Sequence, residues 1–189
     1  MGGVTRSQRT NLLGAVALVA ALSGLAFGLP ALNHALPADR AVPTDRPYAI
    51  GGGVTVVPPP GARIDVTETR PANDSGTVLF RLGPVRYLVS VQPYHGTLPT
   101  AVARLRQRIT GTSGYQVTGT ELTVATASGL TGLQGGYSGP GRGGRYAVFV
   151  TAGRAIEVTV SGDDLDLGRT LPVIDASTGT LTFVPERSR

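Results

Sequence analysis

A long apolar run near the N-terminus restricts this chain more than any other feature of its sequence. Residues 12–29 carry no charge, and the charge-free window extends from Arg9 to Asp39. As a helix, residues 12–32 would reach about 30 Å, which is the thickness of the hydrocarbon core of a bilayer. The sequence therefore predicts a transmembrane helix, or an uncleaved signal anchor, over residues 11–32.

A cleaved secretory signal is the alternative interpretation of the same run. Such signals have an apolar core of about 7–15 residues, followed by a cleavage site made of small residues. The best cleavage site here, Ala26-Phe27-Gly28, lies inside the apolar run. This position favours an anchor that remains, with secretion after signal cleavage as the alternative.

The charges that flank the run predict its orientation. Arg6 and Arg9 precede it without any acidic residue, whereas the charges between residues 39 and 46 balance. By the positive-inside rule, residues 1–10 are a cytoplasmic tail and the chain that follows the membrane lies outside. We therefore expect a single-pass protein of the cell membrane, N-terminus inside and C-terminus outside, with most of the chain extracytoplasmic.

The rest of the chain is predicted to form a linker and one domain. Residues 33–47 contain three prolines and no apolar period, which indicates a Pro-rich linker. Residues 48–186 are long enough for one extracytoplasmic domain, and residues 187–189 are a tail. The chain has no cysteine, so this domain is held by packing without disulfides.

Short apolar runs separated by glycine and proline predict a β-rich domain. The expected strands are 50–57, 63–70 (with Ile64 and Val66 on one face), 77–82, 85–92, 120–126, 130–138, 144–150, 155–160 and 180–184. Gly83-Pro84 is expected to join the third and fourth strands as a hairpin. Residues 146–150 are apolar without alternation, which indicates a central strand covered on both faces, whereas residues 155–160 alternate.

Two helices complete the predicted fold. Residues 98–110 place apolar side chains in one stripe, with Arg104, Arg106 and Arg108 along its borders. Residues 165–176 predict a weaker, broken helix, because Gly168 and Pro172 lie inside it. The fold class is therefore α+β: an antiparallel sheet with one clear and one weak helix packed on it.

This order of elements resembles the PsbP/Mog1-like domains. The stretches that carry the resemblance are "GGGVTVVPPPGA", the hairpin "GRYAVFVTAGRAIEVTVSG" and the closing strand "GTLTF". The resemblance implies an exported lipoprotein or single-span protein of high-GC bacteria, acting as an accessory or binding module without shared catalytic residues. The layout is also similar to the exported part of some type VII secretion-associated membrane proteins.

Candidate site residues are few. Arg142 and Arg145 lie in the glycine-rich stretch 139–145 and are predicted as a possible contact for a partner or an anion. The three aspartates of residues 163–166 lack the spacing of a calcium loop and are expected to cap a helix. His95 is a lone loop histidine, and no Gly-x-Ser-x-Gly elbow accompanies it. We therefore predict no catalytic residues, no metal, no cofactor and no nucleic-acid partner.

Three functions remain open from the sequence. The first is a non-enzymatic, membrane-anchored accessory domain that binds a protein or cell-envelope partner. The second is a secreted or anchored carrier or sensor of a small hydrophobic ligand, held between helix and sheet. The third is an unrecognised hydrolase that would have to use His95, and the second resemblance implies a role in type VII secretion as a further alternative.

Overall fold

The structure is a computed structural model that describes residues 39–185. The predicted membrane segment 11–32 and the tails 1–10 and 187–189 lie outside the described residues. Neither helix within residues 39–185 is both long and apolar enough to span a bilayer.

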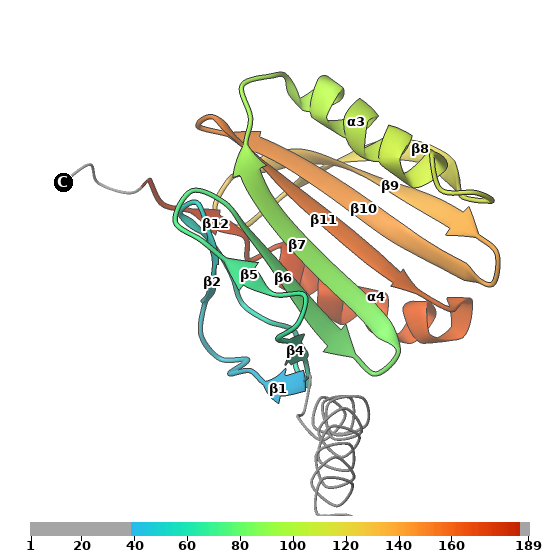
Figure 1. The fold of residues 1–189 in the computed structure, drawn as a ribbon, viewed down its shortest axis with the longest axis horizontal. Coiled ribbons are helices and arrows are strands. Elements are labelled where there is room, and N and C mark those ends of the chain that lie inside the picture. Colours follow the sequence, from blue (N-terminus) through green and yellow to red (C-terminus); the bar gives the residue numbers. More distant parts are fainter. Residues whose placement is uncertain (1–38, 186–189) are drawn as a thin grey trace, which may run out of the picture. The chain divides into compact units, whose positions relative to one another are not determined.

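Within residues 39–185 the chain forms twelve strands and two helices (Figure 1). They are β1 (Asp39–Ala41), β2 (Tyr48–Gly51), β3 (Val54–Val56), β4 (Arg63–Asp65), β5 (Arg70–Pro71), β6 (Gly76–Leu82), β7 (Val85–Pro93), α3 (Leu98–Thr110), β8 (Gln116–Ala125), β9 (Thr131–Gly139), β10 (Arg142–Thr151), β11 (Arg154–Gly162), α4 (Asp164–Thr178) and β12 (Thr182–Phe183).

Most strands belong to one antiparallel sheet. Its order is β1-β4-β6-β7-β11-β10-β9-β8, and β5 pairs with β6 at one side of this path. A second sheet of three short strands has the order β12-β3-β2. The predicted antiparallel sheet with two helices is thus confirmed for the described residues.

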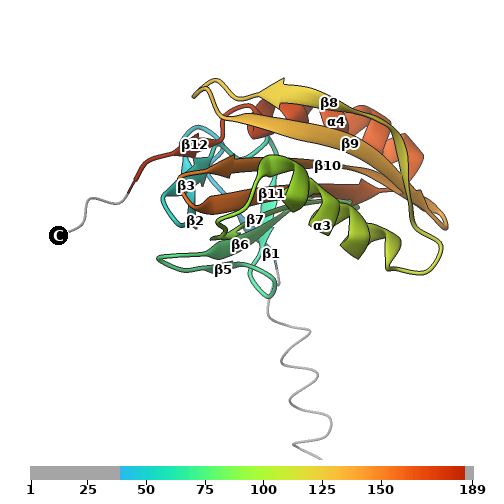
Figure 2. The same ribbon diagram turned by 90° about the horizontal axis from the view of Figure 1, so that it is seen from above.

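The two helices cover opposite faces of the main sheet (Figures 1 and 2). α3 lies over β8, β9 and β10, and its buried residues Ala101, Val102 and Leu105 pack on that face. α4 contacts β7, β10 and β11 on the other face, where Leu167 and Ile174 enter the larger core. Both helices begin at the polar N-caps that their sequences provide, Thr97 and Asp163.

Strand β10 confirms the prediction of a central strand. Its residues 146–149 are all buried, because one helix covers each face. In β11 the faces alternate as predicted, with Ile156, Val158 and Val160 in the larger core, but residues on the other face are buried as well. Ala155, Ile156, Glu157 and Val158 are buried in succession, since this strand also lies at the centre of the sheet.

The predicted strand 50–57 is corrected to two strands. Gly52 and Gly53 have φ angles of 60° and 75°, a region that favours glycine, and the chain turns there between β2 and β3. β3 then pairs with β12, which lies near the C-terminal end of the described sequence, and Val54 lies opposite Phe183. This long-range pairing builds the small sheet.

Three further differences from the predictions have local causes. Residues 39–41, placed in the linker 33–47, form β1 and pair with β4. Val66 is 45% exposed, whereas Ile64 is buried, because the chain leaves the sheet after Asp65. The second helix, α4, continues through Pro172 instead of breaking there. Buried residues on both sides of the proline, such as Leu167 and Ile174, hold the two parts of the helix against the sheet.

Candidate functional site

The face of the main sheet that carries α3 is only partly covered. Residues of neighbouring strands oppose each other in rows, and one row runs from Leu133 through Val148, Glu157 and Ser90 to Thr77. α3 packs over the β9 and β10 end of this row, where Val148 is fully buried. The β7 and β6 end, with Ser90 and Thr77, lies beside the helix and is half-buried.

This open region forms a groove of about 450 Å³, which we name the α3 groove. It has a floor of sheet residues and one wall from the helix. The lining residues are Thr77, Leu88, Ser90, Gln92, Leu105, Arg108, Glu157 and Thr159. Hydroxyl, amide and charged groups thus surround the two leucines, a composition that suits a polar or mixed binding surface.

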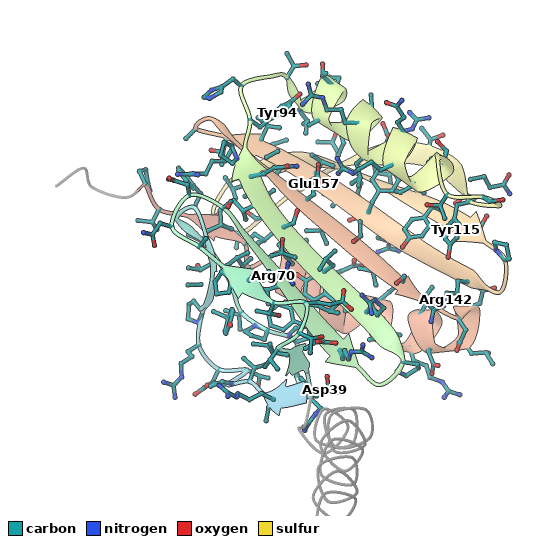
Figure 3. All side chains as sticks on the ribbon, viewed as in Figure 1. Asp39, Arg70, Tyr94, Tyr115, Arg142 and Glu157 are labelled. Carbon is teal, nitrogen blue, oxygen red and sulfur yellow. The ribbon has the colours of Figure 1, made fainter. Side chains whose placement is uncertain are left out.

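A buried carboxylate lies at the centre of the groove. Glu157 is 9% exposed and is labelled in Figure 3 on the face that carries α3. Its oxygens accept one hydrogen bond from Gln92 Nε2 at 3.1 Å and one from the guanidinium of Arg108. The charge of Glu157 is therefore compensated within the groove, as a buried charge requires.

The two partners of this ion pair differ in exposure. The Arg108 side chain is 53% exposed, whereas that of Glu157 is 10% exposed. A guanidinium has five N–H donors in a fork that suits carboxylates and carbonyl oxygens. Arg108 can therefore hold Glu157 on one side and present donors to a bound partner on the other.

We expect Arg108→Ala to lower the free energy of unfolding by about 1 kcal/mol, because the buried carboxylate keeps Gln92 as its hydrogen-bond donor but loses its ion-pair partner. Chemical denaturation at neutral pH measures this change. Arg104→Ala is the matched control, because Arg104 lies 5.2 Å over the Tyr94 ring on the same helix. In a chain that already carries Glu157→Gln, Arg108→Ala should lower the free energy of unfolding by less. An equal decrease with and without Glu157→Gln would contradict the role given to the ion pair.

The arginines of α3 border the apolar stripe as predicted, and each has a different neighbour. Arg106 Nη1 lies 3.6 Å from a carboxylate oxygen of Glu121, to which the Tyr146 hydroxyl donates at 2.6 Å. Burial, and then this hydrogen bond, raise the pKa of Tyr146 far above the ordinary tyrosine value. The stretch RLRQR is thus distributed over separate contacts instead of forming one basic face.

The structure places the two predicted site residues apart. Arg142 begins β10 opposite Gly139, across the Pro140-Gly141 turn, and is exposed. Arg145 lies three positions further, so the two side chains leave opposite faces of the strand. The guanidinium of Arg145 donates to Asp175 of α4, which joins strand to helix. The two arginines thus lie on opposite faces of β10, and the predicted partner or anion contact at Arg142 and Arg145 stays a prediction.

The remaining candidates have structural roles. Asp163 accepts from the backbone N–H of Asp166 at 2.9 Å, which confirms the helix cap and, as the main cause, lowers the pKa of Asp163. His95 lies against the turn at Gly153. Among residues 39–185 no three His, Asp or Glu side chains come close enough together to hold a metal ion.

Sequence reasoning missed the α3 groove, although signals for it exist. Glu157 is the single charge within the apolar run 155–158, and a lone charge in a central strand marks a compensated buried group. In β7, the residues that alternate with buried valines are Leu88, Ser90 and Gln92, which form the groove floor. Their proximity to Arg108 depends on how α3 lies across the sheet.

No protein-family model matches the sequence, and no curated protein matches it. Two solved structures are nevertheless similar in fold. Cyanobacterial PsbP (CyanoP) from Synechocystis sp. PCC 6803 aligns with a TM-score of 0.54 at 14% identity, over 76% of this chain and 95% of that one. LpqN, involved in cell envelope biogenesis of Mycobacterium tuberculosis, aligns with a TM-score of 0.52 at 12% identity, over 74% and 91%. The domain of residues 39–185 therefore has a PsbP/Mog1-like fold, as the sequence resemblance predicts.

Proposed function

We propose that this chain is a non-enzymatic accessory protein that binds a protein or cell-envelope partner outside the cytoplasm. The observation that carries the proposal is the α3 groove, an open part of a central sheet with Arg108 half-exposed at its wall. A sheet face that residues 39–185 leave uncovered beside a helix is available for a partner. The partner would supply oxygen acceptors to Arg108 and small side chains to the floor.

Two further points support this proposal. The fold is similar to that of LpqN, a protein involved in cell envelope biogenesis. At 12% sequence identity this similarity concerns the fold alone. The charge pattern around residues 11–32 favours an anchor with the domain outside the membrane. Both points support the proposal that the α3 groove belongs to an extracytoplasmic, membrane-tethered domain.

Photo-crosslinking tests the groove as a binding surface. A benzoylphenylalanine replaces Gln92 at the groove, or Leu165 as the control, since Leu165 is 77% exposed on α4. In cells that produce the full chain, we expect one adduct of defined mass from position 92 and none from position 165.

A blocking variant sharpens this experiment. Thr159→Arg fills the groove floor and should remove the adduct from position 92, whereas Leu165→Arg should leave it unchanged. Thermal unfolding verifies that both variants fold. Equal adducts from both positions, or an adduct that survives Thr159→Arg, would refute the groove as the binding surface.

The anchor is tested separately by the intact mass of the chain in membrane and supernatant fractions. We expect the full-length mass in membranes, resistant to alkaline extraction, if residues 11–32 remain as a transmembrane helix. A shortened mass outside the cell would instead establish signal cleavage and a secreted domain.

A second candidate function is favoured by an apolar pocket between the proline-rich loop and α4. This pocket measures about 280 Å³, and Pro58, Pro59, Pro60 and Val173 line it together with Thr44, Val57, Ala176, Ser177 and Thr180. It could accept a short apolar group of a small hydrophobic ligand. Native mass spectrometry of the gently extracted chain tests this function, and a purely unliganded protein would count against it.

A further inference from the structure

Among the strands of residues 39–185, β8 forms a long free edge of the main sheet. It has ten residues, Gln116–Ala125, and lies at one end of the strand order (Figure 1). The opposite end is β1, which has three residues and includes the charges of Asp39 and Arg40. Of the two ends of this sheet path, β8 thus offers the longer row of backbone groups for pairing with another strand.

This edge lacks the side chains that usually prevent pairing. Native edge strands are protected by charges, prolines or bulges. The single charge of β8 is Glu121, and its carboxylate is turned onto the Tyr146 hydroxyl and Arg106. The strand otherwise consists of Thr, Val, Leu, Gln, Gly and Ala, and threonine and valine favour β-structure.

A bulge divides β8: it disrupts the first part of the edge and leaves the second half regular. The register with β9 shifts between Thr118 and Leu122, and Gly119 has a φ of 71°. Residues 122–125 then pair without interruption with residues 131–134 of β9. In this half Leu122 is a large apolar side chain that is 64% exposed and that the other described residues leave uncovered.

We propose that β8 pairs antiparallel with β8 of a second copy of this chain, around a two-fold axis at Thr123. When two identical edge strands pair antiparallel in one continuous sheet, they are related by a two-fold axis normal to that sheet. This axis places the α3 faces of both copies on one side of the joint sheet and the α4 faces on the other. A residue can then oppose only itself or a residue an even number of positions away. Among these registers, only those that oppose Leu122 to Leu122 or to Val124 of the second copy pair it with an apolar residue of β8.

The axis at Thr123 is the register that buries the most apolar surface. It opposes Leu122 to Val124 of the second copy and Val124 to Leu122, which gathers four apolar side chains on the α4 face. On the other face Thr123 lies opposite Thr123 of the second copy, and a pair of threonines is favourable between strands. Glu121 opposes Ala125, so no like charges meet. The free edge thus complements itself, which is the reason for choosing a second copy as the occupant.

The expected dimer is weak and depends on concentration. A single pair of strands buries less than the roughly 1,200 Å² of stable complexes. This inference does not depend on the proposed function, because β8 and the α3 groove are separate surfaces.

Cysteine crosslinking tests the pairing and its register, because the chain has no cysteine of its own. Full-length chain is purified in detergent as Leu122→Cys, Thr123→Cys, Val124→Cys or, as control, Leu165→Cys on the exposed face of α4. Mild oxidation is followed by the rate of disulfide-linked dimer formation. Opposed residues have Cβ atoms about 4.5–5.5 Å apart, so Thr123→Cys should crosslink roughly tenfold faster than Leu165→Cys.

Two results would overturn the proposal. One is crosslinking of Thr123→Cys at the same rate as Leu165→Cys, which would indicate random collision or contact through residues 11–32. The other is crosslinking of Thr123→Cys that Leu122→Arg does not slow, because this exposed substitution brings a positive charge into the apolar cluster of each copy. Equal thermal stability of the chain with and without Leu122→Arg verifies the fold. Loss of the photo-adduct at position 92 with the dimer intact would refute the proposed function alone.

Discussion

Gly76→Ala is expected to lower the free energy of unfolding by about 3 kcal/mol and the melting temperature by about 6–12 °C. Gly76 begins β6 and is buried where the small sheet meets the main sheet. A Cβ there would overlap the carbonyl oxygen of Ile50 in β2, well inside the 3.0 Å that real Cβ atoms keep. Gly51 makes the reciprocal approach to the carbonyls of Ala72 and Ser75. Because backbone atoms cannot rotate away, one sheet must move from the other.

Gly168→Ala is the matched control for this prediction. Gly168 lies inside α4, and a Cβ there meets no atom within 4 Å. Alanine favours a helix over glycine, so this variant should gain about 0.5–1 kcal/mol. Thermal and denaturant unfolding of both variants measures the change in the free energy of unfolding, which should be negative for Gly76→Ala and positive for Gly168→Ala. A Gly76→Ala protein as stable as the parent would show that the two sheets are not held in close contact.

Asp65→Ala is expected to cost about 3 kcal/mol of stability at neutral pH. The Asp65 carboxylate is 2% exposed and accepts from the backbone N–H of Thr67 at 2.9 Å and from Arg81 Nε at 3.0 Å. Arg81 lies directly opposite Arg86 on the neighbouring strand, and like charges in that position repel. Asp65 therefore neutralises Arg81, while Glu68 binds Arg86 at 2.7 Å.

The effect of Asp65→Ala should depend on pH in a defined direction. Burial alone would raise the pKa of Asp65, but the hydrogen bonds from Thr67 and Arg81 outweigh it, so its pKa is lowered. A carboxyl with a lowered pKa contributes its full stability above the ordinary value of about 3.9. This contribution is lost as the pH falls through the lower, folded-state pKa.

Denaturant unfolding between pH 2 and pH 8 measures this dependence. The difference between parent and Asp65→Ala should be constant above about pH 5 and shrink at lower pH. Asp45→Ala is the control, because its side chain is 80% exposed, and it should change stability by less than about 0.5 kcal/mol. A difference that grows on acidification would contradict the assignment.

One row of opposed residues links the two surfaces that we propose for binding. It extends from Thr77 in the α3 groove through Glu157 to Leu133, which opposes Thr123 in β8. α3 lies over the part of this row in β10, β9 and β8, whereas the groove at Thr77 and Ser90 lies beside the helix and Thr123 at the β8 edge is exposed. A partner in the groove and a second copy at β8 could therefore bind to the same sheet together, because the helix separates them.

The features that the sequence by itself determined are local. The periodicity of residues 98–110 and the N-cap at Thr97 specify α3 within one stretch of chain. Gly83-Pro84 joins β6 and β7 as a hairpin, with Leu82 opposite Val85. The absence of alternation in β10 indicates a central strand. For α3 and the hairpin the determining contacts lie within a few residues, and for β10 the unbroken apolar run itself indicates two covered faces, so a pattern of residue types is sufficient.

The candidate site was decided by the tertiary structure alone. The pairing of Ser90 with Glu157 and of Val54 with Phe183 joins residues far apart in the chain, and no local pattern encodes these partners. Glu157 is buried because its strand lies between β7 and β10, and it is compensated because α3 brings Arg108 to it. Burial and charge compensation are properties of the packed sheet, so they appear only once distant strands and helices are assembled.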